Sequence, residues 1–134
     1  LVRDIRIAFQ ESTAMKLYVC NVATQHGETE HFSVEDHEAA IREHIGGGPF
    51  HFVIANTNLV PHLPEQWLSE PVRLARSEES EIDGARIIAA DVIDERNRYR
   101  HDPQKLADVI LNLYHEQGEA APRRPDVDSI LAGI

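Results

Sequence analysis

Apolar and polar residues follow two periodicities in turn along the chain, and this order predicts a mixed α/β fold. Residues 2–13 place apolar side chains at helical spacing, and residues 16–22 (KLYVCNV) form a short, nearly continuous apolar run. A helical pattern returns over residues 33–45, followed by a second apolar run over residues 50–56 (FHFVIAN). Such runs are typical of strands buried on both faces of a parallel sheet. The two runs and the helix between them predict a right-handed βαβ unit.

The helix expected over residues 33–45 has clear signals at both ends. Ser33 is a favourable N-cap residue, and Asp36 stands three positions later, as in a capping box. Three consecutive glycines at residues 46–48 end the pattern.

Two further strands are predicted over residues 71–75 and 86–92, after a short helix near residues 64–69. About ten residues separate the two strands, whereas a parallel crossover usually needs about a dozen or more. We therefore expect the two strands to be antiparallel or not adjacent. Their acidic connection ends in Asp83-Gly84, a turn signal.

The last strong helical pattern begins at Asp102-Pro103, where Asp suits the cap and Pro the first turn. We expect residues 1–117 to form one α/β domain with a mainly parallel sheet, and residues 118–134 to form a linker and a weak helix. Because the chain opens inside a helical pattern with no cap before it, we expect residues 1–117 to be the C-terminal part of a larger domain.

Composition narrows the classes of function. The chain has 134 residues, with 42% apolar and 27% charged residues, which fits one globular domain. A net charge of −10 opposes binding of duplex nucleic acid, but a small phosphorylated ligand needs only a local positive site. The sequence contains no membrane-length apolar run and no signal peptide pattern. The single cysteine, Cys20, fits a reducing compartment, so we expect a cytoplasmic protein.

Polar residues gather where the two predicted parallel strands end. Ligands bind outside the carboxyl ends of such strands in open α/β sheets. The first strand runs into a polar loop around Gly27, and the second ends at Asn56. We expect residues 21–30 to form one wall of a ligand site; the alternative is that Asn and Gly serve only as turn residues. The candidate ligand-binding residues here are Asn21, Thr24, Gln25, Gly27, Glu28, Thr29 and Asn56.

A second candidate group consists of Arg96, Arg98 and Arg100, which alternate on a segment expected to be extended. Arginine suits phosphate because its planar fork donates two parallel hydrogen bonds. The alternative is a solvated edge strand whose arginines prevent aggregation; it is favoured for Arg96 and Arg98, and both interpretations stand for Arg100. Trp67 either stacks on a base or caps the core, and we favour the core.

The eight histidines do not predict a metal site. His26, Glu28 and His31 share a loop, and His37 and His44 share a helix face, but no metalloprotease-type spacing or cysteine pair accompanies them. We therefore assign no metal ligand on spacing alone.

Two long motifs resemble the YvcK/CofD-like family. Residues 18–29 (YVCNVATQHGET) and 33–37 (SVEDH) are similar to one family signature, and residues 100–107 (RHDPQKLA) to another. The resemblance spans nearly all of residues 1–117 and implies a Rossmann-like three-layer α/β/α fold. The first motif is nearer the YvcK branch, the gluconeogenesis factors.

The resemblance implies alternative functions. The YvcK branch implies binding of UDP-sugars such as UDP-N-acetylglucosamine by a regulator of carbon metabolism, cell-wall synthesis and cell shape. The CofD branch implies a Mg²⁺-dependent transferase that moves a phospholactyl-type group from a nucleotide diphosphate donor to a deazaflavin. Glu28 and Asp36 are candidate Mg²⁺ ligands, because Mg²⁺ prefers oxygen ligands. A third interpretation is an oligomerisation or interaction module, for which the acidic residues Glu78, Glu79 and Glu81 offer a surface. We favour the regulator, and whether the protein is an enzyme stays open.

The resemblance also assigns residues. It implies that the loop candidates line the ligand crevice, that Arg100 contacts phosphate or sugar, and that Trp67 corresponds to a family aromatic. Two departures are visible: the family's glycine-rich phosphate loop is absent from this sequence, and Pro103 stands where some relatives have a regulatory threonine.

Overall fold

The computed structural model describes residues 3–47, 50–59, 63–75 and 80–120. The helices are α1 (Arg3–Glu11), α2 (Val34–Ile45) and α3 (Pro103–Ala120), with a 3₁₀ turn η1 (Glu65–Trp67). The strands are β1 (Leu17–Val19), β2 (Phe52–Asn56), β3 (Glu81–Ile82) and β4 (Ala85–Ala90). None of these described helices combines the length and apolar character needed to cross a bilayer.

The described strands form one sheet in the order β1-β2-β4-β3. β2 pairs in parallel with β1 and with β4, whereas the short β3 pairs antiparallel with β4. β1, α2 and β2 therefore form the predicted βαβ unit with parallel strands. The prediction of an α/β protein with a mainly parallel sheet is confirmed.

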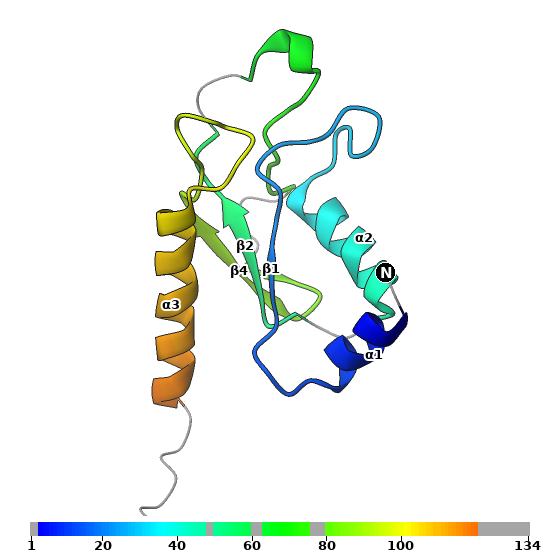
Figure 1. Cartoon of the computed structure of the whole chain (residues 1–134), viewed down its shortest axis with the longest axis vertical. Coiled ribbons are helices and arrows are strands. Elements are labelled where there is room, and N and C mark those ends of the chain that lie inside the picture. Colours follow the sequence, from blue (N-terminus) through cyan, green and yellow to red (C-terminus); the bar gives the residue numbers. More distant parts are fainter. Residues whose placement is uncertain (1–2, 48–49, 60–62, 76–79, 121–134) are drawn as a thin grey trace, which may run out of the picture.

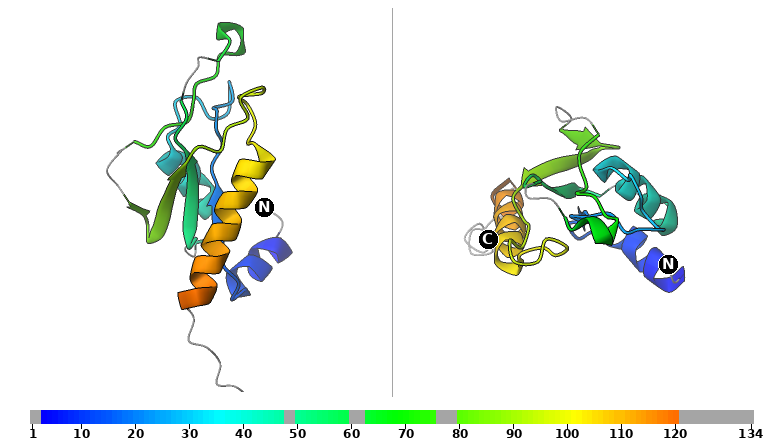
Figure 2. Two further views of the ribbon diagram at one scale, coloured as in Figure 1. Left: turned by 90° about the vertical axis from the view of Figure 1, so that its left-hand side faces the viewer. Right: turned by 90° about the horizontal axis from the view of Figure 1, so that it is seen from above.

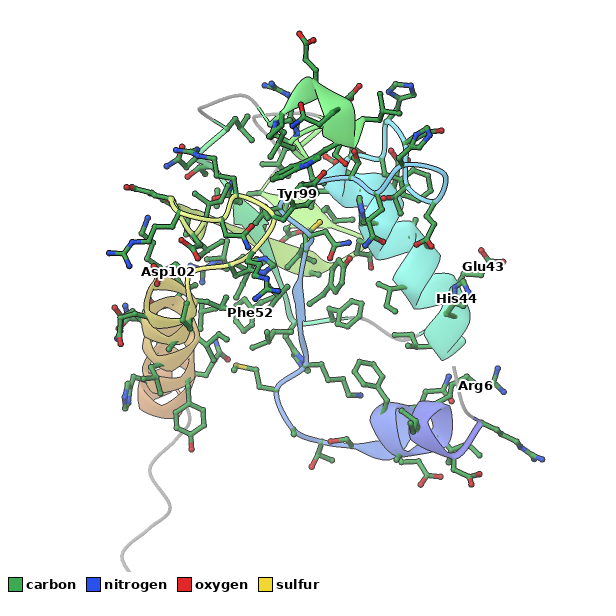
Figure 3. All side chains as sticks on the ribbon, turned by 45° about the horizontal axis from the view of Figure 1, so that its top comes forward. Arg6, Glu43, His44, Phe52, Tyr99 and Asp102 are labelled. Carbon is green, nitrogen blue, oxygen red and sulfur yellow. The ribbon has the colours of Figure 1, made fainter. Side chains whose placement is uncertain are left out.

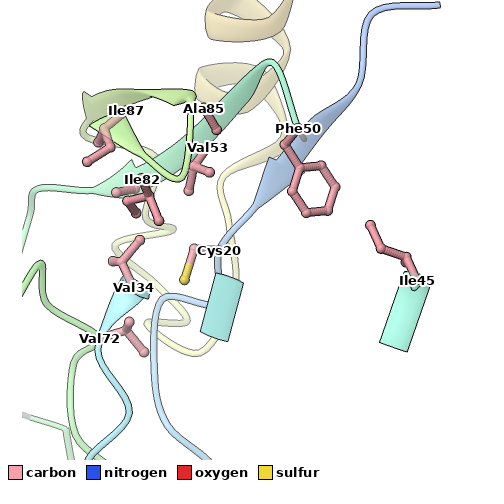
Figure 4. Close-up of a cluster of buried hydrophobic side chains, with 10 residues drawn as sticks. Cys20, Val34, Ile45, Phe50, Val53, Val72, Ile82, Ala85 and Ile87 are labelled. Atoms are coloured by element: carbon pink, nitrogen blue, oxygen red, sulfur yellow. The ribbon is translucent and has the colours of Figure 1, made fainter. Parts of the chain in front are cut away.

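The central strand β2 is buried on both faces and separates two cores. Val53 and Ala55 belong to the core that includes Val34 and Ile45 of α2, which Figure 4 shows in part. Phe52 and Ile54 belong to the core on the opposite face, with α3. Alternate residues of a strand point to opposite faces, so the helices form two outer layers, with α1 and α2 on one side and α3 on the other (Figures 1 and 2). The predicted three-layer arrangement is present.

The ends of α2 are set as the sequence predicts. The Ser33 hydroxyl accepts a hydrogen bond from the Asp36 backbone N–H, and the Asp36 carboxylate accepts one from the Ser33 backbone N–H. Gly46 ends the helix with a left-handed φ of 79°, which glycine adopts without the steric cost of a Cβ atom.

The strand predicted over residues 71–75 is wrong. Pro71 forms only an isolated antiparallel bridge with Ala23, and the Val72 N–H donates to the Val22 carbonyl. The segment binds the loop after β1, and β4 pairs instead with β2 and β3. The two strands were predicted to be antiparallel or not adjacent; since residues 71–75 form no strand of the sheet, there is no such pair of strands.

The predicted turn Asp83-Gly84 joins β3 to β4 as a tight hairpin. Both residues have positive φ, 47° at Asp83 and 86° at Gly84, the combination of a type I′ turn. The two-residue strand β3 was not predicted because so short a segment has no periodicity to read.

Other boundaries also differ from the predictions. β1 is shorter than the predicted residues 16–22, because the chain after Cys20 leaves β2 to bind residue 72. The segment with the three arginines is a series of turns and not an extended strand. α3 continues to Ala120, past the boundary expected at residue 118. The predicted linker and helix in residues 121–134, together with Glu78 and Glu79, lie outside the described residues.

Candidate functional site

The three parallel strands end at the same edge of the sheet, and loops from distant parts of the sequence meet there. The loop after β1, the η1 segment and the loop between β4 and α3 all lie above this edge (Figure 1). Open α/β sheets bind ligands at this edge. The sequence predicted a site here.

The loop after β1 is closed by its own hydrogen bonds. The Thr29 hydroxyl accepts from the Gln25 N–H at 2.8 Å, and the Thr29 N–H donates to the Gln25 carbonyl at 2.9 Å. Gly27 lies at the tip of this turn with a φ of 82°, a conformation that favours glycine. Thr29 and Gly27, both predicted as ligand contacts, therefore shape the loop.

Thr24 fixes this loop to the segment that follows η1. Its side chain is 2% exposed. Its hydroxyl accepts from the Glu70 N–H at 2.9 Å, and its own N–H donates to the Glu70 carbonyl at 2.8 Å. Thr24 thus serves the scaffold through its backbone and its hydroxyl oxygen.

Asn56 has a similar structural role at the end of β2. Its side-chain oxygen accepts from the N–H groups of Asn58 and Val92, and its side-chain nitrogen donates to the Asn58 carbonyl. The residue is 8% exposed. The predicted ligand contact therefore holds the ends of β2 and β4 together, because its amide satisfies backbone groups that the sheet leaves unpaired.

The loop between β4 and α3 folds back on itself and carries Arg100 to the end of β1. Ile93 and His101 form an antiparallel bridge, and the Asp94 N–H donates to the Arg100 carbonyl at 3.0 Å. The Asp94 carboxylate accepts from the backbone N–H of Arg96 at 2.8 Å. These bonds replace the extended strand that the alternating arginines suggested.

His101 connects this loop to β1. Its Nε2–H donates to the Cys20 carbonyl at 3.0 Å, across a separation of 81 residues. A carbonyl can only accept, so the proton is on Nε2. Sequence reasoning did not select His101, although its position between Arg100 and the cap residue Asp102 was a signal. Figure 3 shows Asp102 at the start of α3 and Tyr99 on the loop that precedes it.

The two loops enclose an open pocket of about 310 Å³. Its lining residues are Asn21, Val22, Ala23, Gln25, Tyr99, Arg100 and His101. We call it the Arg100 pocket. It brings together three predicted residues, Asn21, Gln25 and Arg100, all of which are exposed. Two side-chain amides and a guanidinium group can bind phosphate oxygens, hydroxyls and base edges.

Trp67 packs against the Arg100 pocket from outside. Its ring centroid lies 4.5 Å from that of Tyr99, which lines the pocket. Trp67 is 43% exposed, so the favoured interpretation as a core residue is wrong. Leu68, which follows it, is also exposed.

Cys20 lies directly beneath the site but is not a reactive thiol. The residue is 1% exposed, and burial raises the pKa of its thiol to about 12. A thiol with so high a pKa is protonated at neutral pH and is a poor nucleophile. Cys20 is therefore a small buried apolar residue, as expected.

The residues suggested as Mg²⁺ ligands do not belong to a cluster of metal-binding side chains in the described part of the chain. The Asp36 carboxylate accepts hydrogen bonds from both the N–H and the hydroxyl of Ser33, and these bonds lower its pKa. Glu28 is exposed on the turn of the first loop. Within the described ranges, no three His, Cys, Asp or Glu side chains gather in a geometry suited to a metal.

The sheet order and the loops gathered at the strand ends define an open α/β protein, a class whose members bind small ligands at this edge of the sheet. The model of the family described as "2-phospho-L-lactate transferase CofD" matches residues 1–93. The chain therefore belongs to the CofD family.

Curated relatives refine this position within the family. The chain is 30% identical over 110 residues to the gluconeogenesis factor of Bacillus subtilis, covering 79% of this chain and 35% of that protein. It is 32% identical over 117 residues to the gluconeogenesis factor of Halalkalibacterium halodurans, covering 83% and 36%. The chain spans between 26% and 38% of the length of such relatives. The predicted resemblance is confirmed.

A solved structure has the same fold. The crystal structure of a UPF0052 family protein from Bacillus halodurans matches with a TM-score of 0.71 and 31% identity. The match covers 83% of this chain and 37% of that one.

Proposed function

We propose that this protein binds a nucleotide sugar of the UDP-N-acetylglucosamine type in the Arg100 pocket and acts as a cytoplasmic regulator. The observation that carries the proposal is the hydrogen bond from His101 to the Cys20 carbonyl, which holds Arg100 beside Asn21 and Gln25. The bond joins the two family motifs into one pocket.

The chemistry of the pocket supports an anionic, hydroxyl-bearing ligand. The Arg100 guanidinium can form two parallel hydrogen bonds with a phosphate group. Asn21 and Gln25 each offer both a donor and an acceptor, which suits hydroxyls and base edges. The volume of about 310 Å³ is at the lower end of ligand pockets and accommodates part of a nucleotide sugar. A chain of net charge −10 needs such a local cation to attract a phosphate.

The biological role that we propose is based on the names of the relatives. Proteins named gluconeogenesis factors are similar to most of this chain, and this name supports a role in carbon metabolism. The proposed influence on cell-wall synthesis and cell shape rests on the UDP-sugar branch that the motifs resemble.

Calorimetric titration of the protein with UDP-N-acetylglucosamine tests this function. Arg100→Ala should weaken binding roughly 10- to 100-fold, because a hydrogen bond to a charged group contributes about 1.5–3 kcal/mol. Arg3→Ala is the matched control, since Arg3 is exposed on α1 at the far end of the molecule (Figure 1). Absence of binding by the wild-type protein at millimolar ligand would refute the proposal.

The family description supports a second candidate, a transferase that moves a phospholactyl-type group to a deazaflavin. Binding and transfer are separable: product formed from the nucleotide diphosphate donor, deazaflavin and Mg²⁺ would favour the transferase. Tight nucleotide-sugar binding with no product formed would favour the regulator.

A further inference from the structure

A second cavity adjoins the Arg100 pocket and shares one stretch of backbone with it. The second cavity has a volume of about 350 Å³, and Thr24, His26, His31 and Glu70 are among its lining residues. We call it the Glu70 cavity. Thr24 lines the Glu70 cavity and Gln25 lines the Arg100 pocket. Ala23 also lines the Arg100 pocket and His26 the Glu70 cavity, so the two cavities lie on either side of one short backbone segment.

The wall of the Glu70 cavity is fixed by backbone hydrogen bonds. Thr24 and Glu70 are joined by a bond in each direction, at 2.8 and 2.9 Å. The bridge between Ala23 and Pro71 and the bond from Val72 to Val22 continue this contact. The backbone of Glu70 therefore stays in place when its side chain is changed.

The cavity carries acidic and imidazole side chains in pairs. His31 Nδ1 lies 3.4 Å from the Glu70 carboxylate, and His26 Nδ1 contacts the Glu30 carboxylate. Glu65 also lines the cavity. Three carboxylates repel a phosphate, so the phosphates of a ligand that spans both cavities belong on the Arg100 side.

The same side chains suit a sugar ring. Carboxylates accept hydrogen bonds from hydroxyls, and neutral imidazoles both donate and accept. Leu68, which is 61% exposed and lines the cavity, offers an apolar surface to the C–H face of the ring. A cavity that combines these groups matches a hydroxyl-rich ring better than a nucleobase or a phosphate.

Building on the proposed function, we propose that the Glu70 cavity holds the sugar ring of the nucleotide sugar while Arg100 holds its phosphates. The segment from Ala23 to Gln25 then lies under the diphosphate that joins the two halves. Glu70 and His31 become determinants of sugar recognition.

Two probes separate the halves of the ligand: UDP, which lacks the sugar, and UDP-N-acetylglucosamine. Calorimetry on the wild-type protein should show tighter binding of the sugar-bearing ligand. Glu70→Ala should weaken UDP-N-acetylglucosamine binding roughly tenfold, equivalent to about 1.4 kcal/mol, and leave UDP binding unchanged. His31→Ala should act in the same direction. Glu43→Ala is the control, because Glu43 is exposed on α2 away from the cavity (Figure 3).

The outcomes are distinct. The sugar assignment is overturned if Glu70→Ala weakens both probes equally, if it weakens neither, or if wild-type protein binds the two probes equally well. In each of these cases binding by the wild-type protein still supports the proposed function. If the wild-type protein binds neither probe, the proposed function fails and the sugar assignment fails with it.

Discussion

At the scale of single residues, the polar side chains at the sheet edge divide into two groups by what they bind. Thr24, Thr29 and Asn56 bind backbone groups, whereas Asn21, Gln25 and Arg100 line the Arg100 pocket. The sequence predicted all six as ligand contacts. It could not separate them, because the hydrogen bonds of Thr24 and Asn56 reach residues 46 and 36 positions away. Only the fold determines which side chains meet such partners.

The link from His101 to Cys20 gives a prediction at this scale. His101→Ala should weaken nucleotide-sugar binding roughly fivefold, because loss of one hydrogen bond of about 1 kcal/mol frees the loop that carries Arg100. His101→Gln retains a side-chain N–H donor and should recover part of the affinity.

Titration with UDP-N-acetylglucosamine, together with urea denaturation, tests this role. If both His101 variants bind as tightly as the wild-type protein, the hydrogen bond does not position Arg100.

At the scale of elements, the sequence predicted the helix caps and the hairpin turn, which interactions between neighbouring residues determine. The capping box of α2, the Asp102 cap of α3 and the Asp83-Gly84 turn are all present because their hydrogen bonds and backbone angles involve near neighbours. Residues 71–75 have an apolar pattern that suits a strand, but their backbone partners are Val22 and Val34. They lie outside the sheet because β4 pairs with β2 and β3 instead. Such long-range pairing cannot be predicted from a short stretch of sequence.

Two glycines give a matched pair of stability predictions. Gly84 has a φ of 86°, and a methyl group added there would meet no heavy atom within 4 Å. Gly84→Ala should therefore lower the free energy of unfolding only by the backbone cost of a positive φ, about 1–2 kcal/mol. Gly118 lies inside α3 with equally open surroundings, so Gly118→Ala should raise the free energy of unfolding by about 0.5–1 kcal/mol.

Urea denaturation of both variants measures these opposite effects. A Gly84→Ala protein as stable as the wild type would show that the hairpin turn tolerates a different conformation.

At the scale of the whole molecule, a buried charge connects the α2 layer to the hairpin of the sheet. Glu38 is 1% exposed, and Arg42 of the same helix lies 3.4 Å from its carboxylate while also pairing with Asp83 in the β3–β4 turn. Burial raises the pKa of Glu38 despite the neighbouring guanidinium. The periodicity of α2 did not predict this arrangement, because a charged residue at a core position is rare unless it is paired.

The raised pKa of Glu38 determines the direction in which the stability of the fold changes with pH. The folded state holds this proton more tightly than the unfolded state, so the associated stability is complete below the unfolded pKa of about 4.3 and is lost as the pH rises through the folded pKa. Glu38→Gln removes this titration and keeps the shape, and Arg42 keeps Asp83 as its partner. The variant should therefore lose less stability than the wild type between pH 4 and pH 7.

Urea denaturation across this pH range measures the difference. Arg42→Met is the contrasting variant: it leaves the Glu38 carboxylate buried without its cation and should lower the free energy of unfolding at neutral pH below that of the wild type. Identical pH profiles for wild type and Glu38→Gln would contradict the assignment.

The order of the layers was predictable from the alternation of helical and apolar segments, together with the family motifs. The sequence did not predict that the two motifs lie side by side in the fold, because the hydrogen bond that joins them connects residues 20 and 101. Self-association of the chain stays a prediction that light scattering can address.

The contact between Trp67 and Tyr99 supplies a built-in optical signal. The chain contains one tryptophan, and its ring lies against the tyrosine that lines the Arg100 pocket. The fluorescence emission of the chain's indole therefore depends on the environment beside the Arg100 pocket. Occupancy of the pocket can be followed by intrinsic fluorescence, in real time and without a label, including the rate at which a ligand leaves.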